Sequence, residues 1–321
     1  MHRRECLTLA AAAAATTLAG CATPVDDSPL ELSLGTATPG GGFPVYGDAL
    51  AAALAGADAR LTVKPRSTKG SGENTELLES GKLDLALVSG EVASDVLLGL
   101  TRPASRLKVI AAMYPQQAMF AVRGDSPVRQ VRELLGKPVV WGARTSGLVT
   151  LARYVLEGMG LNMERDFLSM FVDRAADGPA AVLDGRALAI FGAGVGSPAL
   201  TAVVQGPAGA RLLVPTPAEV TQVAQRHKFL KPMQVPAGSY AGQAQALDSI
   251  GSWALVLARA DLADGAAWRL ARALHKSQPA FATRLPQARD STLANTLAAA
   301  PAPEFVHAGV RRYAREAGIG V

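Results

Sequence analysis

Short apolar segments alternate with helix-like segments between residues 30 and 100, and this alternation limits the possible folds more than any other feature of the chain. Pro44 falls in the first turn of one expected helix, and Gly56 and Gly81 end two of them. Strands joined by helices through short loops predict a parallel sheet with right-handed crossovers, and therefore an α/β fold. The expected strands are 30–35, 60–67 and 83–89, and the expected helices are 44–56, 70–81 and 91–100.

The alternation restarts in the middle of the chain. Two strand candidates follow each other directly, at 107–114 and 117–124. After them we expect strands at 137–142, 166–173, 186–194 and 251–259, and helices at 128–136, 146–160, 176–185 and from Ser197. The chain from Leu262 to Gly318 is largely helical in pattern.

This organisation predicts two α/β lobes joined by hinge strands, with a ligand cleft between them. Lobe I takes residues 30–122 plus 252–321, and lobe II is an insertion at 125–250. Gly124 and Gly251 lie where the two connections would need conformational freedom. A cleft between two α/β lobes is a common ligand site.

Residues 1–20 have the pattern of an export signal, with the basic start "MHRREC" followed by the apolar run "LTLAAAAAATTLAG". The segment "LAGC" (18–21) resembles a bacterial lipobox, which implies cleavage before Cys21 and a lipid anchor on that residue. A plain signal peptide with an incidental cysteine is the alternative, and Arg3-Arg4 leaves the export route open. Residues 21–29 form a polar tether. We therefore expect a periplasmic, lipid-anchored monomer.

The composition excludes several classes. The chain of 321 residues has a net charge of +5, but its basic residues are scattered, and aromatic residues make up only 5%. This argues against nucleic-acid binding, which uses basic patches and stacking platforms. The only cysteines are Cys6 and Cys21, so the mature chain has no disulfide.

The glycine loop "TATPGGGFPVYGDAL" (36–50) is the first candidate site. It lacks the lysine and hydroxyl of a Walker A loop, and its third glycine position is Val45, so both phosphate-loop patterns fail. Backbone N–H groups before a helix still favour an anion. A tight turn without a ligand is the alternative. The candidate ligand-binding residues of this loop are Thr36, Thr38, Gly41, Gly42 and Phe43.

Four more loops with small and polar residues follow expected strands. They are 66–74, the position after 83–88, 141–147 and 191–198. In open α/β sheets, ligands bind at the carboxyl ends of the strands, where all five loops are expected. The candidate residues are Lys69, Ser71, Asn74, Ser89, Arg144, Thr145, Ser146, Gly147 and Phe191. For Phe43, Tyr46, Trp141 and Phe191, cleft lining and ordinary core packing both fit.

On these segments the chain resembles the TAXI family, the extracytoplasmic solute-binding receptors of one branch of TRAP transporters. The resemblance covers residues 30–320 and is most specific over 66–93. It rests on "LGTATPGGGFPVYGDAL", "GSGENTELLESGKLDLALVSGEVA", "MYPQQAMFAVRGDS", "LLGKPVVWGARTSG" and "HAGVRRYAREAGI". It implies a type II periplasmic-binding-protein fold, a small carboxylate ligand such as glutamate, glutamine or a related organic acid, and delivery to a membrane permease driven by an ion gradient.

The chain departs from the family pattern at Lys69, at Arg144, and at Leu188, where the family has an acidic residue. These departures suggest that Lys69 and Arg144 face each other across the cleft and pair with an anionic ligand such as a dicarboxylate, of which arginine would bind one carboxylate through two hydrogen bonds. Solvated rim residues are the alternative.

An enzyme is not expected, nor is a cofactor. The four histidines are far apart in sequence, without metal-ligand spacing, and no G-x-S-x-G elbow is present. The main prediction is a receptor that delivers a small anionic solute to a TRAP-type permease. A ligand-sensing or scaffold lipoprotein of the same fold, without a transporter, is the alternative.

Overall fold

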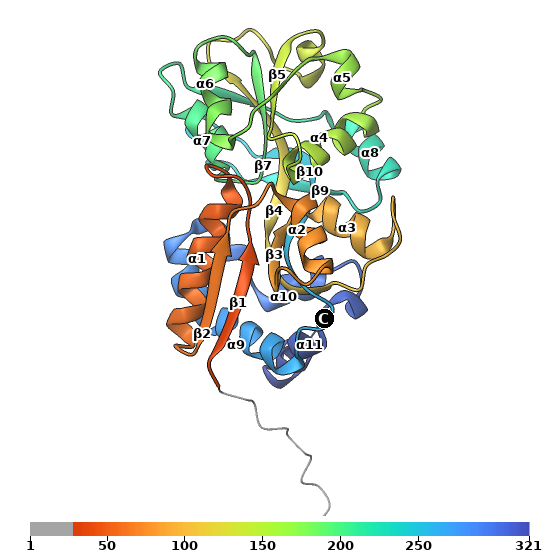
Figure 1. The fold of residues 1–321 in the computed structure, drawn as a ribbon. Helices are drawn as coiled ribbons and strands as arrows, with labels where there is room; N and C mark the ends of the chain where they lie inside the picture. Colours follow the sequence, from red (N-terminus) through yellow and green to blue (C-terminus); the bar gives the residue numbers. More distant parts are fainter. Residues whose placement is uncertain (1–27, 321) are drawn as a thin grey trace, which may run out of the picture.

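The computed structural model describes residues 28–320, which form two lobes stacked along a long central pair of strands (Figure 1). The expected signal peptide, the lipidated Cys21 and most of the tether lie outside the described residues. Within residues 28–320, no helix combines the length and the hydropathy needed to cross a membrane.

The elements follow the expected alternation closely in the first hundred residues. The strands are β1 (Leu30–Gly35), β2 (Leu61–Arg66), β3 (Leu85–Val88), β4 (Lys108–Arg123), β5 (Pro138–Gly142), β6 (Leu168–Phe171), β7 (Ala189–Ala193), β8 (Ala210–Leu213), β9 (Lys231–Val235) and β10 (Leu247–Ala258). The helices are α1 (Gly42–Ala57), α2 (Ser71–Glu79), α3 (Gly90–Leu98), α4 (Gly147–Gly158), α5 (Met163–Asp166), α6 (Gly178–Leu183), α7 (Pro198–Val204), α8 (Pro217–Arg226), α9 (Asp264–Arg284), α10 (Leu293–Ala299) and α11 (Ala308–Glu316).

The strands have the order β2-β1-β3-β10-β4-β7-β5-β6, with β8 paired to β4 and β9 paired to β10. Strand β1 runs parallel to β2 and β3, and β5 runs parallel to β6 and β7. The two crossing strands β4 and β10 are antiparallel to each other and to the neighbouring strands β3 and β7. The parallel pairing expected from the alternation in residues 30–100 is confirmed for β1, β2 and β3, and the crossing strands add antiparallel pairs at the centre of the sheet.

The buried side chains form separate cores in the two lobes. Two hydrophobic clusters contain only residues up to Tyr114 and from Trp253 onward, and these residues form lobe I. The other two clusters contain only residues between Ala118 and Ile250, which form lobe II. The chain therefore crosses between the cores at 115–117 in β4 and 251–252 in β10, close to the expected connections. The exact residues at which each lobe begins and ends stay a prediction.

Helix α1 shows how the sequence builds a lobe around the cleft. Its apolar face buries Tyr46, Leu50 and Leu54, spaced four residues apart, against the sheet. The Tyr46 hydroxyl is 2.8 Å from Ser291 Oγ, so this buried polar group is satisfied. The N-terminus of the helix, at Gly42, lies beside the cleft between the lobes.

The middle of the chain differs most from the expected elements. Strand β4 is continuous over 108–123, although two strands were expected there. Pro115 pairs with Trp253 in the crossing section, and the register shifts between Trp253 and Leu255 without ending the strand. The expected helix at 128–136 is only a 3₁₀ turn at Val131–Leu134. Elements β8, α8 and β9 were not predicted, although Thr216 and Glu219 form the capping box that opens α8.

Gly124 and Gly251 are glycines because the chain packs closely at both positions. A Cβ on Gly251 would lie 2.0 Å from the carbonyl oxygen of Gln116, and one on Gly124 would lie 2.2 Å from that of Ala208. Gly251 lies at the crossing, as expected for a hinge position. Gly124 lies beyond β4 inside lobe II, so its expected hinge role is wrong.

Candidate ligand-binding cleft

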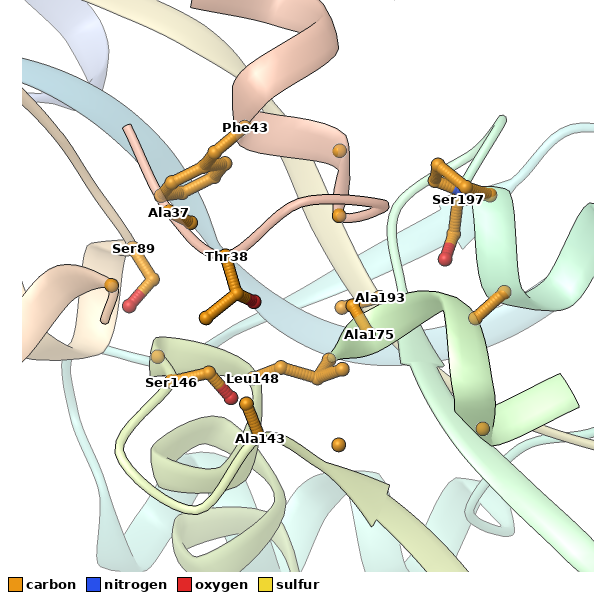
Figure 2. Close-up of a pocket in the computed structure, with 18 of the residues that line it drawn as sticks. Ala37, Thr38, Phe43, Ser89, Ala143, Ser146, Leu148, Ala175, Ala193 and Ser197 are labelled. Carbon is orange, nitrogen blue, oxygen red and sulfur yellow. The ribbon is translucent and has the colours of Figure 1, made fainter. Parts of the chain in front are cut away.

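A cavity of about 120 Å³ lies between the two lobes, beside the crossing section of β4. The loops that follow β1, β2, β3, β5 and β7 all reach it, as the positions of the five candidate loops predicted. Figure 2 shows Ser89 and Ser146 on one side of this cavity and Ala175 and Ser197 on the other, with Thr38 between them. The cavity therefore joins residues that lie more than 150 positions apart in the chain.

The lobes are in contact around the cavity, so the structure is in a closed state. A Cβ on Gly147 of lobe II would lie 2.1 Å from Ser89 Oγ and 2.7 Å from Ser71 Oγ, both in lobe I. A Cβ on Gly70 would lie 3.3 Å from the Cα of Ser146. At the opposite rim, a Cβ on Gly40 of lobe I would clash with Ala176 of lobe II. Glycine at these positions allows the two backbones to approach closely.

Three serines meet where the two lobes touch, and we call Ser71, Ser89 and Ser146 the serine junction. Ser71 is the first residue of α2, and Ser89 and Ser146 are the N-caps of α3 and α4. The Ser89 amide donates to Ser71 Oγ at 3.0 Å, and the Ser146 hydroxyl accepts from the Val149 amide. The junction therefore brings the N-termini of three helices, with their unpaired N–H groups and positive dipole ends, to one corner of the cavity.

Ser89 carries an unused hydrogen-bonding group at this corner. Its side chain is 2% exposed, and its hydroxyl has no hydrogen bond of normal geometry. The amide oxygen of Gln116, in the crossing section of β4, is also buried without a partner at the cavity wall. Buried polar groups without partners are rare in folded proteins, and both of these line the same cavity.

The cavity wall contains no lysine, arginine, histidine, aspartate or glutamate from the described residues. Its polar groups are hydroxyls and amides, and much of the rest is apolar. Gly178 leaves room for both Val140 and Ile190 there, because a Cβ on it would lie 2.9 Å from the Ile190 side chain and 3.2 Å from that of Val140. The apolar side chains of the wall are Phe43, Val140, Leu148, Val172, Ile190, Phe191 and Pro198, with five alanines.

Most candidate residues from the sequence lie at this cavity. The wall contains Thr38, Gly41, Gly42, Phe43, Ser71, Ser89, Ser146, Gly147 and Phe191. Thr36, Lys69, Asn74, Arg144 and Thr145 are not part of it. The difference within single loops follows from side-chain direction, because neighbouring residues at a strand end or helix start point to different sides.

Asn74 and Thr36 hold the loops together from behind the cavity. Asn74 is fully buried, and its Nδ2 donates to the carbonyls of Thr36 at 2.8 Å and Leu87 at 2.7 Å, with a longer contact to that of Gly35. Thr36 Oγ1 donates to the Arg66 carbonyl. These side chains fix the ends of β1, β2 and β3, which carry the cavity loops.

Lys69 and Arg144 are both exposed and do not reach the cavity, so their expected pairing across a bound anion finds no support in this structure. The Arg144 guanidinium instead lies over the ring of Phe171, 3.9 Å from its centroid. Thr145 Oγ1 donates to the Lys69 carbonyl at 3.4 Å, a contact between the lobes at the outer edge of the cleft.

The four aromatic candidates divide between core and cavity. Trp141 and Tyr46 are core residues, and the Trp141 indole donates to Ser169 Oγ. Phe191 serves both roles, because it packs edge-on against Phe120 at 5.1 Å between ring centroids and also lines the cavity. Phe43 is partly buried and covers the cavity from α1 (Figure 2).

Sequence reasoning missed Tyr114, Gln116, Ser197 and Gln287 as cavity residues. Tyr114 and Gln116 belong to the crossing section of β4, where a break between two strands was expected. Gln287 comes from the C-terminal part of lobe I and donates to the Val195 carbonyl at 2.6 Å, which joins the lobes at the rear of the cavity. No local pattern in the sequence marks such a long-range contact.

Among residues 28–320, no cluster of histidine, cysteine and acidic side chains could hold a metal ion. His307 caps α11 by accepting from the Gly309 amide, and its Nε2 is 2.9 Å from the Leu262 carbonyl oxygen. Burial lowers the pKa of His307 and that of His227. Neither histidine lines the cavity.

Solved structures of similar proteins share this architecture. The periplasmic aliphatic sulphonate-binding protein SsuA of Escherichia coli matches with a TM-score of 0.50 at 17% identity, over 89% of this chain and 84% of that one. A protein of Bordetella bronchiseptica RB50 matches with a TM-score of 0.55 at 11% identity, over 91% and 99% of the two chains. At these identities the likeness shows the fold, which is the two-lobed fold of periplasmic solute-binding proteins.

The sequence comparison is more specific. The profile of the NMT1-like family matches residues 34–318, which include both lobes, the crossing strands and every loop of the cavity. The chain therefore belongs to the NMT1-like family.

Proposed function

We propose that this protein is an extracytoplasmic solute-binding receptor that closes its two lobes over a small organic monoanion, in the first instance a carboxylate. The observation that carries the proposal is the closed cavity, where the serine junction and the unpartnered Ser89 hydroxyl meet in a wall without charged side chains. Groups from both lobes reach a ligand together only in the closed state, which is how binding would favour closure.

The electrostatics of the cavity support an anion with one charge. Helices α2, α3 and α4 present their N-termini at the serine junction, and each such terminus stabilises a nearby negative charge by about 0.3–1 kcal/mol. An ammonium group would find no carboxylate in the wall, and a second carboxylate would find no cation there. Burial of an unpaired charge is costly, so amino acids and dicarboxylates fit less well than monocarboxylates.

The size of the cavity supports a short ligand. A volume of about 120 Å³ is somewhat smaller than the engineered cavity of about 150 Å³ that binds benzene in another protein. A carboxylate with a three- or four-carbon chain fills such a space, and its apolar end would contact side chains such as Val140 and Ile190.

Transport is the role we propose for this binding. The resemblance to the TAXI family supports a TRAP-type permease as partner, and the lipobox around Cys21 supports anchoring to the cell envelope as a periplasmic lipoprotein. The E. coli neighbour is named for aliphatic sulphonates, which are also organic monoanions.

A matched pair of ligands tests this proposal by thermal shift. Butyrate and 2-aminobutyrate differ only by one ammonium group, and butanesulfonate tests whether a sulfonate replaces the carboxylate. We expect butyrate at 100 times its dissociation constant to stabilise the protein by about 2.7 kcal/mol. The same concentration of 2-aminobutyrate should have no measurable effect. Stronger stabilisation by 2-aminobutyrate, by glutamate or by succinate would reject the monoanion assignment.

A further inference from the structure

The Glu91 carboxyl group is buried behind the cavity wall and does not line the cavity. Glu91 is the second residue of α3, two positions after Ser89, and its side chain is 0% exposed. Its Oε2 accepts a hydrogen bond from Ser252 Oγ at 2.8 Å, whereas its Oε1 is buried without a partner. A buried carboxylate that lacks a cation and has an unpaired oxygen is costly.

No lysine, arginine or histidine of the described residues is hydrogen-bonded to Glu91 or forms an ion pair with it. The Glu91 carboxyl contacts the hydroxyl of Ser252 in β10. It also lies near the phenol of Tyr154 in α4, on which Glu157 of the same helix acts as well. Asp95, on the same helix as Glu91, acts on the same phenol. Burial raises the pKa of Glu91 to about 7. The Ser89 and Ser252 side chains and the Glu91 backbone lower this pKa, but their effects are smaller than that of burial.

The acidic residues of the neighbouring helix α2 do not face Glu91. Glu73 accepts from the Lys69 amide, and Glu79 pairs with Arg102 on the surface. The residue of α2 that turns toward α3 is Ser71, through its bond to the Ser89 amide. The polar side-chain groups that contact Glu91 are therefore hydroxyls. Basic side chains line the groove next to Gly90 and Ser252, where His227 packs against Tyr154 and Arg226 pairs with Glu157.

We propose that Glu91 takes up one proton from solvent when the anion enters the cavity, and that the protonated carboxyl then positions the Ser89 hydroxyl. The neutral carboxyl donates its proton to Ser89 Oγ, and the Ser89 O–H is then directed to the anion. With ionised Glu91, the Ser89 proton is drawn toward the carboxylate, and two negative charges lie on either side of one hydroxyl. Glu91 is thus a positioning residue, and this role depends on the proposed binding function.

A groove between the lobes lies next to the residues that flank Glu91, although Glu91 itself does not line it. The groove has a volume of about 970 Å³, and Gly90 and Ser252 form part of its wall. Gly90 directly precedes Glu91, and Ser252 is its hydrogen-bond partner. In this proposal the proton enters from the groove past the Ser252 side chain, because the Glu91 carboxyl itself is fully buried.

The linkage has a definite sign. Glu91 is protonated below about pH 7 and ionised above it in the free protein, so anion affinity is full at low pH and is lost as the pH rises through this range. If only the protonated form binds well, the affinity falls about tenfold between pH 6 and pH 8. At pH 8 the binding of each anion is accompanied by uptake of about one proton.

Calorimetric titration of the protein with butyrate at pH 6, 7 and 8, in buffers of different ionisation enthalpy, tests this proposal. Glu91→Gln is always neutral, so its butyrate affinity should not change with pH and should exceed that of the unmodified protein at pH 8. Glu76→Gln makes the same change at an exposed position of α2 and should keep the tenfold dependence. Ser252→Ala removes the hydrogen bond that favours ionised Glu91, so it should move the loss of affinity to higher pH.

The outcomes separate this proposal from the proposed function. Butyrate binding that is equally strong at pH 6 and pH 8, or that keeps its pH dependence in Glu91→Gln, rejects the role of Glu91 and leaves the receptor function intact. If Glu91→Gln does not fold, Ser252→Ala decides: an unchanged pH at the midpoint of the loss of butyrate affinity also rejects the role of Glu91. No butyrate binding to the unmodified protein at any pH rejects the monoanion site and the linkage together.

Discussion

Gly147→Ala is expected to lower the affinity for butyrate by about 100-fold while the unliganded protein remains folded. The new Cβ would lie 2.1 Å from Ser89 Oγ and 2.7 Å from both Ser71 Oγ and Ser89 Cβ, across the contact between the lobes. Rotation of the hydroxyls cannot relieve the contact with Ser89 Cβ, so closure costs about 2–3 kcal/mol more than in the unmodified protein. Each 1.4 kcal/mol corresponds to tenfold in affinity.

The open form does not contain this clash, because the two lobes are then apart. The control is Gly56→Ala near the end of α1, where nothing lies within 4 Å of the added methyl group. Calorimetry gives the affinities, and small-angle X-ray scattering shows whether saturating butyrate still compacts the molecule. An unchanged affinity in Gly147→Ala would mean that the ligand does not require the closed contact.

Asn74→Ala is expected to lower the free energy of unfolding by about 3 kcal/mol in the absence of any ligand. The substitution removes the buried hydrogen bonds of Asn74 Nδ2 to the Leu87 carbonyl and to the Thr36 carbonyl, which keeps its 3.2 Å bond from Thr68 Oγ1, and each loss costs about 1–3 kcal/mol. Urea denaturation measures the change. The matched control is Asn295→Ala, where a half-buried amide donates to the single carbonyl of Asp290, with an expected cost of about 1 kcal/mol.

The same variant decides between two roles for Asn74. The sequence pattern placed it among the ligand-binding residues, whereas the structure places it behind the cavity as a link between strand ends. If Asn74→Ala keeps its full stability and loses only its butyrate affinity, Asn74 is a ligand-binding residue.

Alternation in the sequence predicted the elements of lobe I because each has its own local pattern and its own glycine or proline boundary. It also predicted the cavity loops, because parallel strands bring their carboxyl ends to one edge. The loop around Ser71 illustrates the limit of this reasoning. Lys69, Ser71 and Asn74 lie within six residues, yet only Ser71 faces the cavity, and side-chain direction at a helix start depends on tertiary packing.

The crossing section of β4 could not be predicted from local pattern. Pro115 suggested a break between two strands, and the pairing of Ser252 with Gln116, over 130 residues apart, is what keeps the strand continuous there. As a consequence, Tyr114 and Gln116 were not expected at the cavity. The basic residues Lys69 and Arg144 were expected there because anions attract cations, but the helix N-termini of the serine junction present positive dipole ends without a charged side chain.

The central claim is that the closed interlobe cavity holds the carboxylate of a small monoanion at the serine junction. A crystal structure of the protein grown with butyrate tests it most directly. The account predicts one butyrate between the lobes, with its carboxylate within hydrogen-bond distance of Ser89 Oγ and its alkyl chain toward Val140 and Ile190. A butyrate bound instead through Lys69 or Arg144 at the outer edge of the cleft, with the cavity empty, would contradict it.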